Sequence, residues 1–158
     1  MGAPKIPEKR WSIDLEKKIQ ESHYGESYSQ RYSFDSNSER EIFIIDTPPP
    51  YPSGTWHIGA VAQYSMIDVI ARSQRLLGKE VRFPWGVDRN GINIEFTVER
   101  KHGRKMRSYD RGEFLDLCAE TIESYTQAMR ETAKRVGLSC DFDNEYLPDA
   151  PDCRAVTQ

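Results

Sequence analysis

Three consecutive prolines at positions 48–50 follow an apolar run at positions 42–45 after only two intervening residues. The run predicts a buried strand covered on both faces. A proline lacks the N–H that a β-ladder needs, so three of them cannot continue the strand. The chain must therefore leave the sheet at Thr47 and turn over the strand's carboxyl edge, where open α/β sheets bind ligands.

A helix is predicted after this turn, because apolar residues recur from Trp56 at close to helical spacing. They are Ile58, Val61, Ala62, Met66, Val69, Ile70 and Leu77. His57 and Gly59 then lie in the first turn, where unpaired N–H groups and the positive end of the helix dipole attract phosphate. We expect His57 to donate to a phosphate oxygen and Gly59 to admit a flat ring. For His57, capping or packing is the alternative.

Two further segments share the pattern of a known family. Residues 81–95 form a short strand that ends in Pro-Trp-Gly, and a carboxylate, Asp88, precedes the next helical stretch. Residues 138–146 read Leu-Ser-Cys-Asp-Phe-Asp-Asn-Glu-Tyr. With residues 48–59, they resemble the amino-terminal half of the catalytic domain of class I aminoacyl-tRNA synthetases, most closely the valine, isoleucine and leucine group. The resemblance covers the chain from about residue 42 to residue 158.

The triple proline favours valine as the amino acid, because isoleucine enzymes tend to read Gly-Pro-Pro. The overall resemblance is to the archaeal type of enzyme. Isoleucine remains the alternative. Ala60 stands where the family signature, His-Ile-Gly-His, has its second histidine. An alanine cannot hydrogen-bond a triphosphate. We interpret this departure as variation within the subfamily, with loss of catalysis as the other possibility.

The resemblance implies ATP-dependent activation of valine to valyl-adenylate and transfer of the acyl group to tRNA(Val). ATP would arrive with Mg²⁺, and no metal site is expected in the chain itself. The implied contacts are Asp88 with the ammonium of valine, Pro49, Pro50 and Tyr51 with its side chain, His57 with the triphosphate, and Gly59 with the adenine. The expected partners are valine, tRNA(Val) and the remainder of the synthetase.

Two other classes of function remain open: a non-catalytic ATP-binding module derived from a synthetase, and an unrelated nucleotidyltransferase. A dinucleotide-binding dehydrogenase is disfavoured, because no G-x-G-x-x-G follows a strand. Residues 105–108, Lys-Met-Arg-Ser, resemble the family's second signature, Lys-Met-Ser-Lys-Ser. They lack its second lysine and come too early in the chain, so we predict only a loop there.

Composition indicates a cytoplasmic protein. No apolar run approaches the roughly 20 residues that span a bilayer, and residues 1–7 lack the apolar core of a secretory signal. Three cysteines without paired spacing indicate free thiols. A net charge of −3 disfavours a free-standing nucleic-acid binder. The one basic cluster, residues 99–107, is interpreted as a solvated helix end, with a tRNA contact as the alternative.

The predicted fold class is α/β, the first half of a Rossmann-like nucleotide-binding catalytic domain. Residues 1–40 form an arm with one short helix that lies against the body and a loop over residues 22–38. Residues 41–158 form the half domain, whose order of strand, helix, strand, helix, helix implies a parallel sheet with the first strand central. A long helix is predicted between Asp110 as N-cap and Gly137 as C-cap. We expect a truncated or split product, inactive alone.

Overall fold

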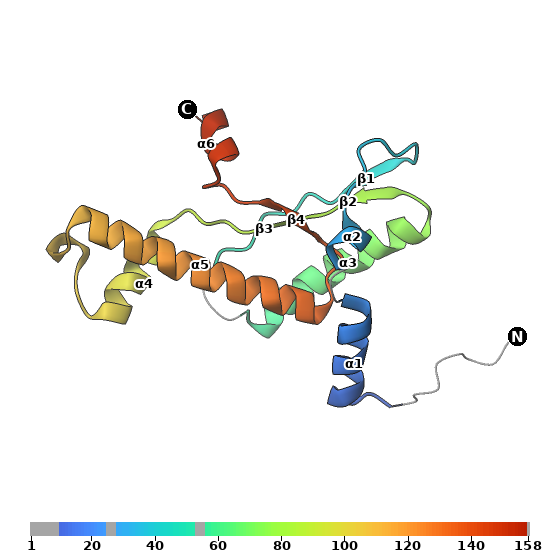
Figure 1. The fold of residues 1–158 in the computed structure, drawn as a ribbon, viewed down its shortest axis with the longest axis horizontal. Coiled ribbons are helices and arrows are strands. Elements are labelled where there is room, and N and C mark those ends of the chain that lie inside the picture. The colour runs from blue at the N-terminus through green and yellow to red at the C-terminus, as the bar shows by residue number, and fades with distance from the viewer. Residues whose placement is uncertain (1–9, 25–27, 53–55, 158) are drawn as a thin grey trace, which may run out of the picture.

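Parallel strands and helices alternate along the chain in the computed structural model, which describes residues 10–24, 28–52 and 56–157 (Figure 1). The architecture is α/β, as predicted. The elements are α1 (Ile13–Tyr24), α2 (Tyr28–Tyr32), β1 (Ile42–Ile44), α3 (Ile58–Leu76), β2 (Glu80–Arg82), β3 (Pro84–Gly86), α4 (Ile92–His102), the 3₁₀ turn η1 (Met106–Ser108), α5 (Arg111–Val136), β4 (Asp141–Tyr146) and α6 (Pro151–Thr157).

Strands β2 and β3 form one continuous ribbon, interrupted only at Phe83. β1 pairs with β2 and β4 pairs with β3, both in parallel. Glu80 N donates towards β1, to Glu41 O (3.0 Å), whereas Phe83 O accepts from Asp141 N of β4 (2.8 Å). Alternate residues of a strand turn their backbone groups to opposite edges. Among the described residues the ribbon therefore lies between β1 and β4, and β1 lies at an edge. The central position of the first strand in the complete sheet stays a prediction.

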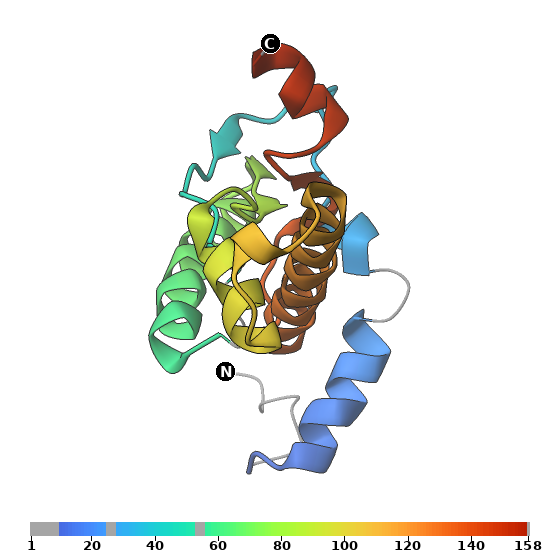
Figure 2. The same ribbon diagram turned by 90° about the vertical axis from the view of Figure 1, so that its left-hand side faces the viewer.

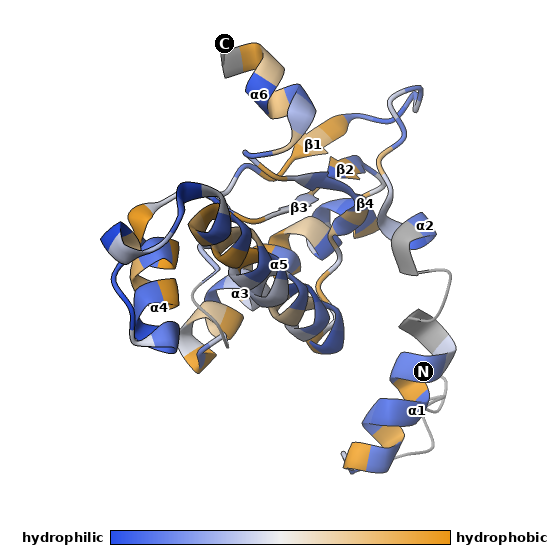
Figure 3. Ribbon diagram, turned by 60° about the vertical axis from the view of Figure 1, so that its left-hand side comes forward, coloured by the Kyte–Doolittle hydropathy of each residue, from blue (hydrophilic) through white to orange (hydrophobic). Residues whose placement is uncertain are grey.

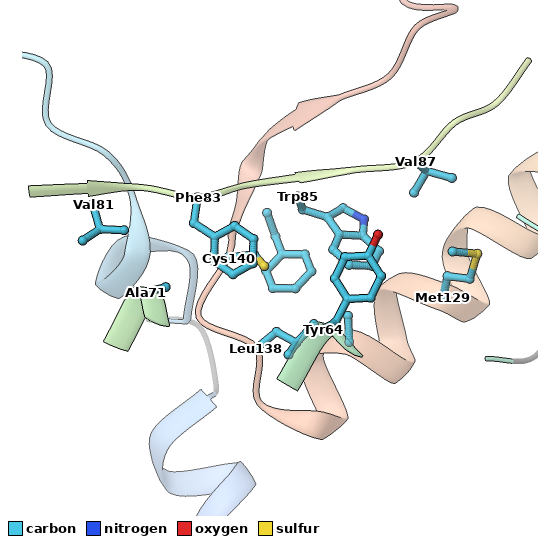
Figure 4. Packing of buried hydrophobic residues seen from close by; sticks show 11 residues of the cluster. Tyr64, Ala71, Val81, Phe83, Trp85, Val87, Met129, Leu138 and Cys140 are labelled. Atoms are coloured by element: carbon cyan, nitrogen blue, oxygen red, sulfur yellow. The ribbon is translucent and has the colours of Figure 1, made fainter. Parts of the chain in front are cut away.

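One face of the ribbon supplies the hydrophobic core. Its alternate side chains, Val81, Phe83, Trp85 and Val87, are each at most 3% exposed. They pack against residues of α3 and α5, which lie on the same side of the sheet (Figures 1 and 4).

Within the described residues, only one face of β1 is covered. Phe43 of β1 packs against the core. Ile42 and Ile44 point to the opposite face and are 47% and 60% exposed, because both covering helices lie on the other side. Figure 3 shows β1 as a hydrophobic strand near the upper edge of the molecule.

The ends of α5 follow the predicted caps. The Asp110 carboxylate accepts from Gly112 N (2.8 Å) and Glu113 N (3.4 Å), which satisfies N–H groups of the first turn. Gly137 ends the helix at φ +84°, a conformation that favours glycine. The Glu113 side chain pairs with Arg104 (3.3 Å) and so does not complete a reciprocal capping box.

The amino-terminal arm is only partly as predicted. Its expected helix is α1, which extends away from the rest of the described chain (Figure 2) and touches α5 through Gln20 Nε2, a donor to Arg135 O (2.9 Å). The predicted loop contains a second short helix, α2. Its Tyr32 packs against the core, with the Arg75 guanidinium 5.1 Å from the ring centroid.

A buried polar cluster joins α3 to the turn before β4. Asp68, 6% exposed, accepts from Ser139 N (2.7 Å) and from the Ser139 hydroxyl, and pairs with Arg72 Nε (2.7 Å). Arg75 Nη2 donates to Ser139 O (2.9 Å). The cluster therefore fixes the start of β4 against α3.

Within the described residues, no helix is both long enough and apolar enough to cross a membrane. None of the three cysteines, all of which lie in the described residues, is joined in a disulfide.

Candidate active site

The ladder between β1 and the central ribbon is interrupted by prolines on both facing edges. Its last bond in β1 runs from Ile45 N to Arg82 O (2.9 Å). Continuing the register of β1 and β2 would require N–H donors at Pro84 on one edge and at Pro49 on the other. Neither residue has one, so the ladder of backbone hydrogen bonds cannot continue in register beyond this point.

Backbone contact resumes only where Asp88 N donates to Pro50 O (2.9 Å). Between the two bonds lies a cavity of ≈ 510 Å³. Pro49 and Pro50 line it, whereas Tyr51 and Asp88 do not. The lining residues are Ile45, Asp46, Thr47, Pro48, Pro49, Pro50, Tyr64, Phe83, Pro84, Trp85, Gly86, Cys140 and Tyr146. The lining is mostly apolar and suits a small aliphatic group.

Tyr64 of α3 forms one wall of this cavity and holds the proline turn. Its hydroxyl donates to Pro48 O (2.9 Å), and its ring stacks on Trp56, with centroids 5.0 Å apart. Burial, reinforced by Cys140, raises the pKa of Tyr64 to about 12, so the phenol remains a donor at neutral pH. The sequence interpretation missed Tyr64. Its one signal was its spacing of two helical turns after His57, which favours a shared helix face.

His57 is the N-cap of α3. Its Nδ1 accepts from Gly59 N (2.9 Å), which is the capping role that the sequence left open. In a neutral imidazole an accepting Nδ1 leaves the proton on Nε2. Because His57 is exposed, this Nε2–H can donate to a ligand while the cap is in place. The capping and phosphate-binding roles are therefore compatible.

Gly59 is required by the position of the His57 ring. A Cβ at residue 59 would lie 2.5 Å from His57 Cε1 and 3.0 Å from Nδ1, closer than real Cβ atoms approach. The cap geometry thus supplies a reason for glycine here that does not involve a ligand. The approach of an adenine ring to Gly59 stays a prediction.

A second cavity of ≈ 420 Å³ lies at the amino end of α3. It is lined by Pro50, Tyr51, Trp56, His57, Ala60, Gln63 and Tyr64. It shares Pro50 and Tyr64 with the apolar cavity, so the two sites adjoin. Residues 53–55, which belong to the signature segment, lie outside the described residues.

Asp88 begins a turn beside the proline segment. Its Oδ1 accepts from Asn90 N (3.2 Å), and Gly91 follows at φ +141°. Burial, and secondarily the Asp88 charge, raise the pKa of Tyr51. The structure therefore brings Asp88, Pro50 and Tyr51 together, although Asp88 lines neither cavity.

The basic cluster at the end of α4 is organised by Glu99. Its carboxylate accepts from Met106 N (2.8 Å) and Lys105 Nζ (2.9 Å), and these bonds lower the pKa of Glu99. The Arg104 guanidinium lies 3.9 Å from the centroid of the Tyr109 ring. Such internal partners favour a folded helix end, and the tRNA contact stays an alternative. The described residues contain no group of three or more His, Cys, Asp and Glu that could hold a metal ion.

A sequence model of the family described as tRNA synthetases class I (I, L, M and V) matches residues 19–156. The chain belongs to this family. The resemblance first seen in residues 48–59, 81–95 and 138–146 is thereby confirmed.

Similar members of the family include valine–tRNA ligases of archaea. That of Archaeoglobus fulgidus is 46% identical over 129 residues, which is 82% of this chain and 15% of the relative. That of Methanocaldococcus jannaschii is 39% identical over 144 residues (91% and 16%), and that of Aeropyrum pernix 39% over 160 residues (98% and 19%). The chain therefore spans less than one fifth of these relatives.

A solved class I structure shares the fold. The Agrobacterium radiobacter LeuRS, in a crystal structure of its ternary complex with tRNA and LeuAMS, matches with a TM-score of 0.65 and 26% identity. The match covers 89% of this chain and 16% of that chain. The parallel α/β arrangement described above is thus that of the class I catalytic region.

Proposed function

We propose that this chain is the amino-terminal part of a valine–tRNA ligase of archaeal type. Residues 1–40 are the arm and residues 41–158 the first half of the catalytic domain. The carboxylate of valine attacks the α-phosphorus of ATP, which releases pyrophosphate, and the acyl group then passes to the terminal ribose of tRNA(Val). The observation that carries the proposal is the pair of adjoining cavities, one mostly apolar and one at a helix N-terminus, that meet at Pro50 and Tyr64.

The apolar cavity receives the side chain of valine. Pro49 and Pro50 form one wall, and Tyr51 closes the neighbouring cavity next to them. Asp88, which is bonded through its N–H to Pro50 O, pairs with the ammonium. A pocket that measures only size separates amino acids that differ by one methylene by roughly 1–3 kcal/mol, and it rejects an isosteric hydroxyl poorly. Threonine is therefore the most difficult competitor.

The cavity at the start of α3 receives the phosphates of ATP. His57 donates through Nε2, the first-turn N–H groups and the helix dipole favour negative charge, and Gly59 lies where the adenine approaches. The chain's contribution to catalysis is positioning and electrostatic stabilisation, with no side chain as nucleophile. Mg²⁺ enters with the triphosphate. Ala60 leaves His57 as the one imidazole at this helix start, which is a property of the subfamily.

The partners follow from the same proposal. They are valine, tRNA(Val) and the remainder of the synthetase chain, in the cytoplasm. The chain alone is inactive, because part of the machinery lies outside it.

Valine-dependent exchange of pyrophosphate into ATP by the complete ligase tests this function. Asp88→Asn should abolish exchange, because it removes a charge-assisted bond to the ammonium. Asp116→Asn, which changes an exposed carboxylate on α5, is the matched control and should leave exchange unchanged. His57→Ala should lower the maximal rate more than it raises the KM for valine. Binding of ATP without exchange by the unmutated protein would favour a non-catalytic module, and faster exchange with isoleucine would reassign the amino acid.

A further inference from the structure

Arg89 connects the turn that follows β3 to two other parts of the fold. Its side chain is only 13% exposed. Nη1 donates to Glu123 Oε2 of α5 (2.7 Å), and Nε lies 3.0 Å from Asp149 Oδ1, in the segment between β4 and α6. The last two atoms are buried, and neither has a hydrogen-bond partner among the described residues. They therefore form an ion pair shielded from water.

The turn begins where the backbone hydrogen bonds between the ribbon and β4 end. Val87 N donates to Tyr146 O (3.1 Å), which is the last bond of the ribbon to the β4 side. Asp88 is held on the opposite side through its bond to Pro50 O. On the β4 side, Arg89 is attached through its side chain instead of through its backbone.

From this geometry we propose that Arg89 is a positioning residue that sets the orientation of the Asp88 carboxylate, a role that rests on the proposed contact between Asp88 and the ammonium of valine. Arginine suits the position because its planar, forked guanidinium can address two carboxylates at fixed angles. A lysine ammonium is a point charge on a flexible stem and holds the turn less rigidly. Glu123 is 58% exposed and Asp149 28%, so Asp149 is the more buried of the two anchors.

A purely structural role would be to tie α5 to the β4 region, and the chain offers a matched control for it. Arg130 of α5 pairs with Glu145 of β4 through Nε (2.5 Å) and Nη2 (2.6 Å). The two side chains are 19% and 12% exposed, so this pair is at least as buried as the two pairs of Arg89. Arg130 has no contact with the turn of residues 88–91 among its described interactions. Loss of a tie between layers would affect both arginines alike, whereas loss of positioning would affect only Arg89.

The test compares Arg89→Met, Arg89→Lys and Arg130→Met in the complete ligase. In pyrophosphate exchange, Arg89→Met should raise the KM for valine by about tenfold or more, since misplacement of a contact by about 1 Å can cost far more. The KM for ATP should stay within about twofold. Arg89→Lys should be intermediate. Arg130→Met should leave both constants unchanged.

Amide hydrogen exchange provides a readout that needs no activity. Arg89→Met should accelerate exchange at the Asp88 and Asn90 amides, and Arg130→Met should not. An unchanged valine KM, an equal rise in both KM values, or the same behaviour in Arg130→Met would overturn the role of Arg89. Absence of valine-dependent exchange in the unmutated ligase would instead overturn the proposed function, while the amide measurement would still decide whether Arg89 holds the turn. If Arg89→Met fails to fold, Asp149→Asn is the smaller change that removes the charge facing Arg89 Nε. The same effects on the KM for valine and on amide exchange are then expected of Asp149→Asn.

Discussion

Replacing Gly59 by alanine should separate activity from stability. The new Cβ would lie 2.5 Å from His57 Cε1, so the exposed ring must swing away. It then loses the bond from the residue 59 N–H to Nδ1, and Nε2 leaves the position from which it faces a phosphate. The backbone of α3 need not move, because the group that gives way is a side chain.

The two contributions to stability partly cancel. Loss of a side-chain N-cap costs ~0.5–2 kcal/mol, and alanine in place of glycine within a helix returns up to ~1 kcal/mol. With a gain of ~0.5–1 kcal/mol from alanine, the unfolding free energy should thus fall by no more than ~1.5 kcal/mol. Loss of one oriented donor typically lowers a rate by ~10²–10³. We therefore expect Gly59→Ala to be almost as stable as the parent and strongly impaired in exchange.

A double-mutant cycle of His57→Ala and Gly59→Ala provides the assay, with urea unfolding and pyrophosphate exchange of each variant. In the His57→Ala background, Gly59→Ala should stabilise the protein by ~0.5–1 kcal/mol, and any loss of rate that remains there measures the proposed approach of the adenine to Gly59. Full activity of the single Gly59→Ala variant would show that exchange does not depend on the orientation of the His57 ring. If Gly59→Ala lowers the rate equally with and without His57, the substrate itself contacts Gly59, as predicted for the adenine.

Three further predictions concern buried groups. Asp68→Ala should lower the unfolding free energy by about 3 kcal/mol, whereas Lys79→Ala, which breaks an exposed pair, should cost under about 1 kcal/mol in urea titrations. The pKa of Tyr64 is raised from 10.0 to about 12, so the unfolded state loses this proton first; stability should fall between those pH values, and less so in Tyr64→Phe. Burial, and then the Asp68 charge, raise the pKa of Cys140, so iodoacetamide at neutral pH should modify this thiol only after unfolding, as mapped by mass spectrometry.

Locally determined features were predictable from the sequence. Both caps of α5 follow from single residues, because Asp110 supplies an acceptor and Gly137 a left-handed backbone. The interruption of β1 likewise follows from the missing N–H groups of the prolines.

Features that depend on contacts distant in sequence were not predictable in the same way. β4 reads Asp-Phe-Asp-Asn-Glu-Tyr, a composition poor in strand formers, and it is a strand because β3 pairs with it. The same strand brings Cys140 and Tyr146 to the cavity, so both were missed. The apolar pattern of β1 also could not reveal that α3 and α5 cover the same face.

The most direct test of the account is a crystal structure of the complete ligase with a non-hydrolysable analogue of valyl-adenylate. We predict that the isopropyl group lies in the cavity beside Pro49 and Pro50, that the ammonium is within hydrogen-bonding distance of the Asp88 carboxylate, and that His57 Nε2 faces the phosphate. An analogue with its side chain outside this cavity, or with its ammonium on a different carboxylate, would contradict the assignment of the site.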